Sequence, residues 1–331
     1  MTEPQRVSVR VRYWLLRKHV RARLAWLLAG GLAWGAPVLP LAGLFRLLPA
    51  LLEHLPTAWR GVDYSLCRQN LEALGHPPTQ ATALACRHAV LQWQRAVHER
   101  VYPRHQPEAL RAWVRRIPEV DPQGCGAASR PALYLLTHTG EYWMAVVSVM
   151  ARERLPTRFL IPVWNFSDPF TRASLLQLEG LGHDVEVLDA AHPATALAMA
   201  RALKRGERVI VFCDLPVSVG ALHFGEPLPG RLFRRPAQFV KGPLFLAAKL
   251  RCDALLLGHR AVLGAEGEVH VLARIPAAPL EIMQMAWMTA LERFLAAAPE
   301  QWLYLPRLEA FYHRQRSTAE QRRAAGGRGR P

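Results

Sequence analysis

The sequence has few acidic residues and no pattern among its cysteines. Its 331 residues include 26 Asp and Glu against 42 Lys and Arg, which gives a formal net charge of +16. A basic surplus of this size favours a partner such as nucleic acid, an anionic membrane or a phosphorylated ligand. The cysteines lie far apart and form no C-x-x-C pair, which argues against a zinc site or a disulfide framework. We therefore expect a reducing compartment and no bound metal. The cysteines are Cys67, Cys86, Cys125, Cys213 and Cys252.

Several motifs of known function are also missing. No G-x-S-x-G turn occurs, which argues against a serine esterase. Another kind of hydrolase is an alternative interpretation. Such an enzyme would release free fatty acid in the absence of any acceptor. No zinc finger, RNA-recognition signature or interleaving of aromatic and basic residues is present, so nucleic acid is not an expected partner. The positive charge gathers at the two ends of the chain. Residues 314–331 are expected to be a basic disordered tail.

One long apolar run follows the basic N-terminal flank. Leu24 to Phe45 contains no charged residue and, at about 22 residues, is long enough to cross a bilayer's hydrocarbon core. The basic residues before it favour a cytoplasmic N-terminus if the helix spans the membrane. Pro37 and Pro40 interrupt the run, so a re-entrant helix in one leaflet is the alternative. A buried helix of a soluble protein is a third interpretation.

The remaining sequence predicts a helical region followed by an α/β region. We expect a basic flank and anchor helix over 1–55, helices over 56–120 and an α/β domain over 121–313. Short apolar runs alternate with helical stretches in this last part, which predicts a mainly parallel sheet flanked by helices. The expected strands are 132–137, 158–163, 184–188, 208–214, 254–259 and 269–275, and the expected helices are 141–153, 170–181, 193–205, 239–250 and 281–298.

Three polar side chains lie at or just beyond the ends of predicted strands of this sheet. They are His138, Asn165 and Asp214. Ligands of open α/β sheets collect beyond the carboxyl ends of the strands, so this edge is the expected site. A histidine can take a proton from an alcohol near neutral pH when a carboxylate orients its other nitrogen. Glu141, three residues on, is the expected carboxylate, and Asp214 is the second candidate. A structural histidine is the alternative to a catalytic one.

The order of the motifs resembles the bacterial lipid A biosynthesis late (lauroyl/myristoyl) acyltransferases, within the glycerolipid and lysophospholipid acyltransferase superfamily. The resemblance covers nearly the whole chain. It begins with the apolar N-terminal segment, which corresponds to the family's membrane anchor, and the other motifs follow in order. The pieces that carry it are "RQNLEAL", "HTGEYW" at the histidine motif, "LIPVWNFSDP", "VIVFCDLPVSVGALHFGEP", "KGPLFLAAKL" and "PEQWLYLPR". Two positions depart from the family pattern. Trp143 stands where the family has its acid, and Ile161 stands where it has an arginine.

The resemblance implies transfer of a fatty acyl group from acyl carrier protein or coenzyme A to a hydroxyl of a lipid A-like acceptor. His138 would be the general base and Glu141 would hold it, with no cofactor beyond the acyl thioester. The site would lie on the cytoplasmic side of the inner membrane. The altered motif leaves a second interpretation, a family member that acts on a specialised metabolite or only binds lipid or carrier protein.

Basic residues near the site are candidate contacts for phosphate or for an acidic carrier protein. They are Arg172, Arg234, Arg235 and Lys241. Three of them lie in the segment "GRLFRRPAQFVKG", which we expect to be a loop. A solvated basic loop without a ligand is the alternative. The oligomeric state, the acyl chain length and the choice of carrier cannot be inferred from these patterns.

Overall fold

A computed structural model describes residues 62–101, 107–125, 131–164, 175–219, 222–263 and 265–312. The expected anchor at 24–45 and the expected tail at 314–331 lie outside these residues. Among the helices that the model describes, none combines the length and the apolar character that a membrane crossing needs.

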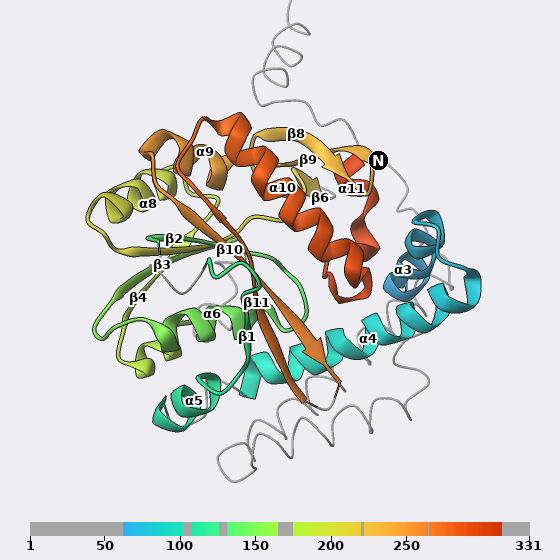
Figure 1. Ribbon diagram of the computed structural model, residues 1–331, viewed down its shortest axis with the longest axis horizontal. Coiled ribbons are helices and arrows are strands. Elements are labelled where there is room, and N and C mark those ends of the chain that lie inside the picture. Colours follow the sequence, from blue (N-terminus) through green and yellow to red (C-terminus); the bar gives the residue numbers. More distant parts are fainter. Residues whose placement is uncertain are drawn as a thin grey trace, which may run out of the picture.

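The fold is α/β, with a mostly parallel sheet of seven strands (Figure 1). The strand order is β1-β11-β10-β2-β5-β3-β4, and every neighbouring pair is parallel except β10 and β11. The central strand β2 has the sequence LYLL and is buried at every position. Continuous apolar runs of this kind are typical of strands covered on both faces. The strands are β1 (Glu119–Val120), β2 (Leu133–Leu136), β3 (Arg158–Val163), β4 (Asp184–Asp189), β5 (Arg208–Phe212), β10 (Ala254–Val262) and β11 (Ala265–Ile275).

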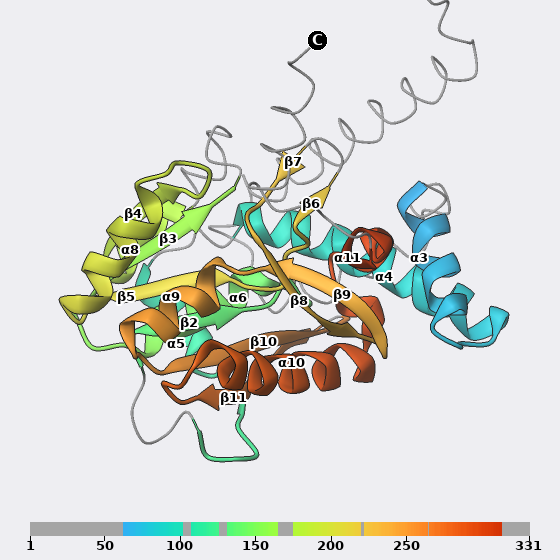
Figure 2. The same cartoon turned by 90° about the horizontal axis from the view of Figure 1, so that it is seen from above.

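Helices cover both faces of the sheet, as expected for this class. Helices α5 and α6 pack on one face, and α8, α9 and α10 pack on the other (Figures 1 and 2). The strand predictions are confirmed to within a few residues, and so are the helices expected over 141–153, 193–205 and 281–298. The bounds are α5 (Pro107–Val114), α6 (Tyr142–Arg152), α8 (Thr195–Lys204), α9 (Gly242–Leu250) and α10 (Leu280–Ala297).

The expectation was wrong in three places. The stretch expected to be a basic loop is a β-hairpin of β8 (Pro227–Leu232) and β9 (Arg235–Val240). Its turn residues Phe233 and Arg234 have φ of 48° and 66°, a left-handed conformation that bulky side chains rarely adopt, so their identity gave no turn signal. The helix expected from Phe239 begins instead at Gly242, because Phe239 and Val240 complete β9. Residues Gln177–Leu181, expected to be α-helical, form a 3₁₀ helix.

The helical region packs against the C-terminal part of the chain. Helix α3 (Val62–Ala73) lies toward the same side of the molecule as α11 (Glu309–Tyr312) in both views, and α4 (Pro78–Val101) follows it (Figures 1 and 2). The Asn70 side-chain amide donates to the carbonyl of Leu305 at 2.7 Å, and His88 Nδ1 lies 2.8 Å from the carbonyl oxygen of Glu300. These bonds connect α3 and α4 to two short 3₁₀ helices, Pro299–Gln301 and Leu305–Arg307.

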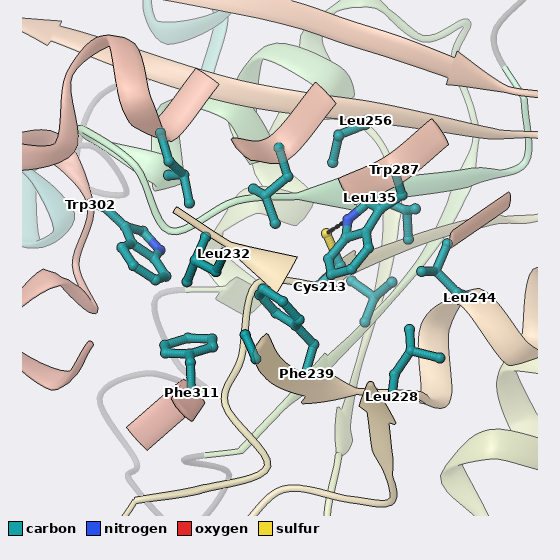
Figure 3. Close-up of a cluster of buried hydrophobic side chains, with 14 of the residues drawn as sticks. Leu135, Cys213, Leu228, Leu232, Phe239, Leu244, Leu256, Trp287, Trp302 and Phe311 are labelled. Atoms are coloured by element: carbon teal, nitrogen blue, oxygen red, sulfur yellow. Dashed lines mark hydrogen bonds between the residues drawn. The ribbon is translucent and has the colours of Figure 1, made fainter. Parts of the chain in front are cut away.

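The core on the α10 side of the sheet is built around large aromatic side chains (Figure 3). Trp287 of α10 is fully buried, and its indole nitrogen donates to the sulfur of Cys213 at 3.1 Å. Phe239 of the hairpin meets the Trp287 ring edge to face, with ring centres 5.0 Å apart. Trp302 and Phe311 extend the same cluster. The residue next to Cys213 is Asp214, so this core fixes the strand end that carries one of the candidate site residues.

Candidate active site

His138 lies just beyond the carboxyl end of β2, before α6 begins. Its backbone is held on both sides: its N–H donates to Asp214 Oδ2 at 2.7 Å, and its carbonyl accepts from the N–H of Leu303 at 2.9 Å. The His138 side chain is 12% exposed. It is therefore mostly enclosed but still accessible, at the edge of the sheet where open α/β folds bind ligands.

Asp214 is the carboxylate that orients the His138 ring. His138 Nδ1 lies 2.7 Å from Asp214 Oδ1, and Asp214 is fully buried. The indole N–H of Trp302 donates to Asp214 Oδ2 at 2.9 Å. Because a carboxylate only accepts hydrogen bonds, Nδ1 carries the proton of the neutral imidazole and Nε2 keeps the lone pair. The arrangement can therefore take a proton at Nε2 and stabilise the imidazolium that forms.

Glu141, the first expected partner of His138, is paired elsewhere. Its carboxylate is 1% exposed and lies 2.5 Å from Gln94 Nε2 and 2.6 Å from His98 Nδ1, both on α4. The expectation placed the start of a helix near Gly140, so that side chains three residues apart would lie close together. Helix α6 begins at Tyr142, after both of them. The prediction of a His138–Glu141 pair was therefore wrong, and the second candidate, Asp214, holds that position.

A buried polar cluster supports the loop between β2 and α6. The backbone N–H of Glu141 donates to His259 Nδ1 at 3.1 Å. Burial lowers the pKa of His259 to about 4, so the ring is neutral at pH 7 and its Nδ1 can accept this bond. Gly140 has φ of +54° and donates its N–H to the carbonyl of Gln301 at 2.8 Å. An added Cβ there would lie 2.6 Å from the carbonyl oxygen of His259, so the close approach of β10 requires glycine.

Three aromatic rings surround the His138 imidazole. Phe212, the last residue of β5, stacks on it with ring centres 4.2 Å apart. Tyr142 and Tyr304 meet it edge to face at 5.0 Å and 5.2 Å. Burial raises the pKa of both tyrosines, helped by the negative charge of Glu99 at Tyr142 and of Asp214 at Tyr304. Both hydroxyls therefore stay protonated and neutral beside the histidine.

Sequence reasoning did not single out Trp302, Tyr304 or Phe212 as site residues. Trp302 and Tyr304 belong to the segment "PEQWLYLPR", which was noted only as part of a motif order. Phe212 stands two residues before Asp214 in a strand. The closeness of Phe212 to Asp214 in the same strand was the available signal.

The basic candidates that the structure describes make contacts away from the histidine. The Arg234 backbone N–H donates to Glu292 Oε1 at 3.0 Å. Arg235 pairs with Glu309 at 3.2 Å and lies 3.7 Å from the centre of the Tyr312 ring. The Lys241 ammonium lies over the ring of Phe245 at 5.0 Å. These contacts are with α9, α10 and α11, and none is with His138 or Asp214. Asn165 and Arg172 lie outside the described residues.

The thiols of Cys67 and Cys213 are both buried. Burial raises the pKa of Cys67 to about 12 and raises that of Cys213 as well, which makes both poor nucleophiles. Within the residues that the structure describes, no three His, Cys, Asp or Glu side chains gather as metal ligands would. A cavity of about 470 Å³ lies between the end of α5 and the β10–β11 turn, and neither His138 nor Asp214 lines it.

No protein-family model matches the chain, and no curated protein matches it significantly.

Proposed function

We propose that this chain is a membrane-associated O-acyltransferase that moves a fatty acyl group from a thioester to a lipid hydroxyl. The observation that carries the proposal is the pair of His138 and Asp214, 2.7 Å apart at the carboxyl edge of the sheet. General bases of this kind activate hydroxyl groups at neutral pH. The poor nucleophilicity of the two buried thiols, Cys67 and Cys213, supports direct attack on the thioester over an acyl-cysteine intermediate.

The proposed reaction is a single displacement. His138 Nε2 takes the proton of the acceptor hydroxyl as its oxygen attacks the thioester carbonyl carbon. The tetrahedral intermediate then collapses, the carbon–sulfur bond breaks and an ester remains. The departing thiolate takes the proton from the imidazolium, which restores the neutral base. Atoms and charge balance without any other reactant.

Asp214 acts on the histidine and does not touch the substrate. Its Oδ1 keeps the proton on Nδ1, and its charge stabilises the imidazolium while Nε2 holds the acceptor's proton. The bonds from Trp302 and from the His138 backbone fix the carboxylate in this position. The correct tautomer therefore exists before substrate binds, which is the preorganisation that general-base catalysis needs.

The substrate class rests on the sequence. The order of motifs resembles the lipid A late acyltransferases, which implies acyl carrier protein or coenzyme A as donor and a lipid A-like acceptor. The uncharged segment 24–45 and the net charge of +16 favour attachment to the cytoplasmic face of an anionic inner membrane. An acidic carrier protein would also be attracted to so basic a chain.

Purified full-length protein tests this proposal. It is mixed with an acyl carrier protein thioester and a lipid A precursor in detergent, and products are followed by mass spectrometry. The expected product is the acceptor plus one acyl chain, and it disappears with His138→Ala at unchanged thermal stability. Free fatty acid released at the same rate without acceptor would indicate a hydrolase. Transfer that survives His138→Ala would refute the mechanism.

A protein that binds lipid or carrier without turnover is the second candidate. It is favoured by the departures at the family motifs, where Trp143 replaces the acid and Ile161 the arginine. Such a protein would bind the acyl thioester but form no product with any acceptor. Mass spectrometry of lipids from cells with and without the gene separates the two, because only an enzyme changes a lipid by one acyl chain. The same measurement would reveal a specialised acceptor.

A further inference from the structure

Tyr304 is held against His138 by the backbone. The N–H of Leu303 donates to the carbonyl of His138 at 2.9 Å, and Thr139 and Trp302 form an antiparallel bridge. The rings of Tyr304 and His138 meet edge to face, with their centres 5.2 Å apart. Two segments that are bonded to each other thus fix a phenol ring next to the proposed base.

The Tyr304 hydroxyl can donate a hydrogen bond to a ligand. Tyr304 is only partly buried, and its hydroxyl makes no hydrogen bond to a residue that the structure describes. The other tyrosine beside His138 differs, because the hydroxyl of Tyr142 is bonded to the carboxylate of Glu99. Of the two tyrosines that meet the imidazole, Tyr304 is therefore the one with a donor to spare.

The imidazole offers a matching acceptor. His138 Nδ1 faces Asp214, and Nε2 makes no hydrogen bond to a residue that the structure describes. A donor, the Tyr304 hydroxyl, and an acceptor, His138 Nε2, therefore lie on neighbouring rings that are both partly exposed. A hydroxyl that attacks a carbonyl presents the complement, because it gives up a proton while the carbonyl oxygen gains negative charge.

Burial and charge keep the proton on the Tyr304 hydroxyl. Burial raises the pKa of Tyr304 above its ordinary value, and the negative charge of Asp214 raises it further. The effect of Asp214 also indicates that the hydroxyl lies near the His138–Asp214 pair. A phenol that keeps its proton at neutral pH can donate a hydrogen bond but does not compete with His138 as the base.

The loop after His138 uses two of its backbone donors within the fold. The N–H of Gly140 donates to the carbonyl of Gln301 at 2.8 Å, and the N–H of Glu141 donates to His259 Nδ1 at 3.1 Å. Tetrahedral intermediates of acyl transfer are stabilised by backbone N–H groups or by side-chain donors, tyrosine among them. Because these two N–H groups are already used, the structure favours a side-chain donor beside the histidine.

We propose that Tyr304 is a catalytic residue whose hydroxyl donates a hydrogen bond to the thioester carbonyl oxygen as that oxygen gains negative charge. The inference rests on the proposed acyl transfer. As the acceptor oxygen bonds to the carbonyl carbon, His138 Nε2 takes its proton and an electron pair moves onto the oxygen that faces Tyr304. When the carbon–sulfur bond breaks, that pair re-forms the carbonyl and the thiolate takes the proton from His138. Tyr304 keeps its own proton throughout, so atoms and charge still balance.

The test measures acyl transfer and the binding of two unreactive analogues of the donor. One is an alkylphosphonate on a pantetheine arm, in which a tetrahedral, negatively charged group replaces the carbonyl. The other is the matching ketone, in which a methylene group replaces the sulfur and the carbonyl stays planar. Full-length wild type, Tyr304→Phe and Tyr312→Phe are compared. Tyr312 is the matched control, because its hydroxyl donates to the carbonyl of Leu232 at 3.3 Å and takes no part in the site.

Tyr304→Phe is expected to lower kcat about 100-fold and to leave KM for the thioester unchanged, because the lost bond forms only as charge develops. Its affinity for the phosphonate should fall by a similar factor, while its affinity for the ketone changes little. The pH at which kcat is half-maximal should match wild type, since His138 remains the base. Tyr312→Phe should match wild type throughout. An unchanged kcat, or equal losses of affinity for phosphonate and ketone, would overturn the inference.

The binding measurements separate this inference from the proposed function. If wild type forms no ester but prefers the phosphonate to the ketone, and Tyr304→Phe loses that preference, the acyl transfer fails and the Tyr304 donor stands. If wild type transfers acyl groups and Tyr304→Phe transfers them equally well, the transfer stands and the Tyr304 donor fails. Wild type that neither transfers nor prefers the phosphonate would overturn both. Thermal melting of each variant shows that it is folded.

Discussion

The indole nitrogen of Trp302 lies 2.9 Å from Asp214 Oδ2, across 88 residues of sequence. The other oxygen of the same carboxylate faces His138 Nδ1. Asp214 therefore receives one bond on the reactive side and two that fix its position, one from Trp302 and one from the His138 backbone. A tryptophan far away in the sequence thus determines how the histidine is held.

Trp302→Phe tests this relationship. The ring keeps most of its packing, but Asp214 loses one of its three donors. We expect kcat to fall about tenfold, since a hydrogen bond to a charged group contributes roughly 1.5–3 kcal/mol, part of which the His138 bonds retain. KM for both substrates should stay constant, because the Trp302 side chain is fully buried. A steady-state comparison decides this, and a change confined to KM would contradict it.

Two carboxylates near the histidine should respond differently to neutralisation. Asp214→Asn should lower kcat by about 10³- to 10⁴-fold, because an amide can favour the wrong tautomer of His138. Glu141→Gln should mainly lower the free energy of unfolding, by about 1–3 kcal/mol, because its amide N–H₂ would face a donor on Gln94 or His98. The measurements are kcat per folded molecule and urea unfolding. The reverse pattern would restore Glu141 as the partner of His138.

Stability should fall in mild acid because of buried histidines. Burial lowers the pKa of His88 to about 4, below the value near 6.5 of an unfolded chain. Between these values the unfolded state binds more protons, so the free energy of unfolding falls as pH drops from about 6.5 to about 4. The full effect is roughly 3 kcal/mol per histidine, and His259 adds a similar one.

Replacing His88 by glutamine measures how much His88 contributes to the fall in the free energy of unfolding at acid pH. The glutamine amide can still donate to the Glu300 carbonyl but does not titrate. Urea unfolding at pH 7, 6 and 5 should show a shallower fall for His88→Gln than for wild type. His192→Gln, at an exposed position, is the control and should keep the wild-type slope. Equal slopes for His88→Gln and wild type would show that His88 is not the source.

Gly140 should tolerate no side chain. Gly140→Ala would place a methyl group 2.6 Å from the His259 carbonyl oxygen and 2.7 Å from the Ala261 nitrogen, at a φ of +54°. We expect a loss of about 2–4 kcal/mol of stability, from backbone strain and overpacking together. Gly75→Ala is the matched control, since Gly75 has φ of +95° with nothing within 4 Å. It should cost only the strain, about 1–2 kcal/mol. Thermal or urea unfolding of both variants measures the difference.

The sequence predicted what local patterns determine. Apolar runs such as the one in β2 are buried on both faces, so the strands and the mainly parallel sheet could be inferred, and with them the edge that carries His138 and Asp214. The partner of His138 could not be inferred, because it depends on where α6 begins and on how β2 and β5 lie side by side. Spacing along the chain favoured Glu141 as the partner of His138. The pairing of β2 with β5 instead places Asp214 beside His138.

The β8–β9 hairpin shows the same limit. Its two turn residues are neither glycine nor asparagine, and its charged residues led to the prediction of a loop. The ladder between Pro227 and Val240 and the packing of Phe239 on Trp287 stabilise it instead.

The attachment of α3 and α4 to the C-terminal segment has a consequence for biosynthesis. Asn70 bonds to Leu305 across 235 residues, and Trp302 reaches Asp214 only after nearly all of the described chain has been made. A nascent chain on the ribosome completes the last strand of the sheet at Ile275, yet Asp214 lacks its third donor until translation passes residue 302. Premature stops or proteolytic cuts between these points should therefore give fragments in which the Trp302 bond to Asp214 is missing.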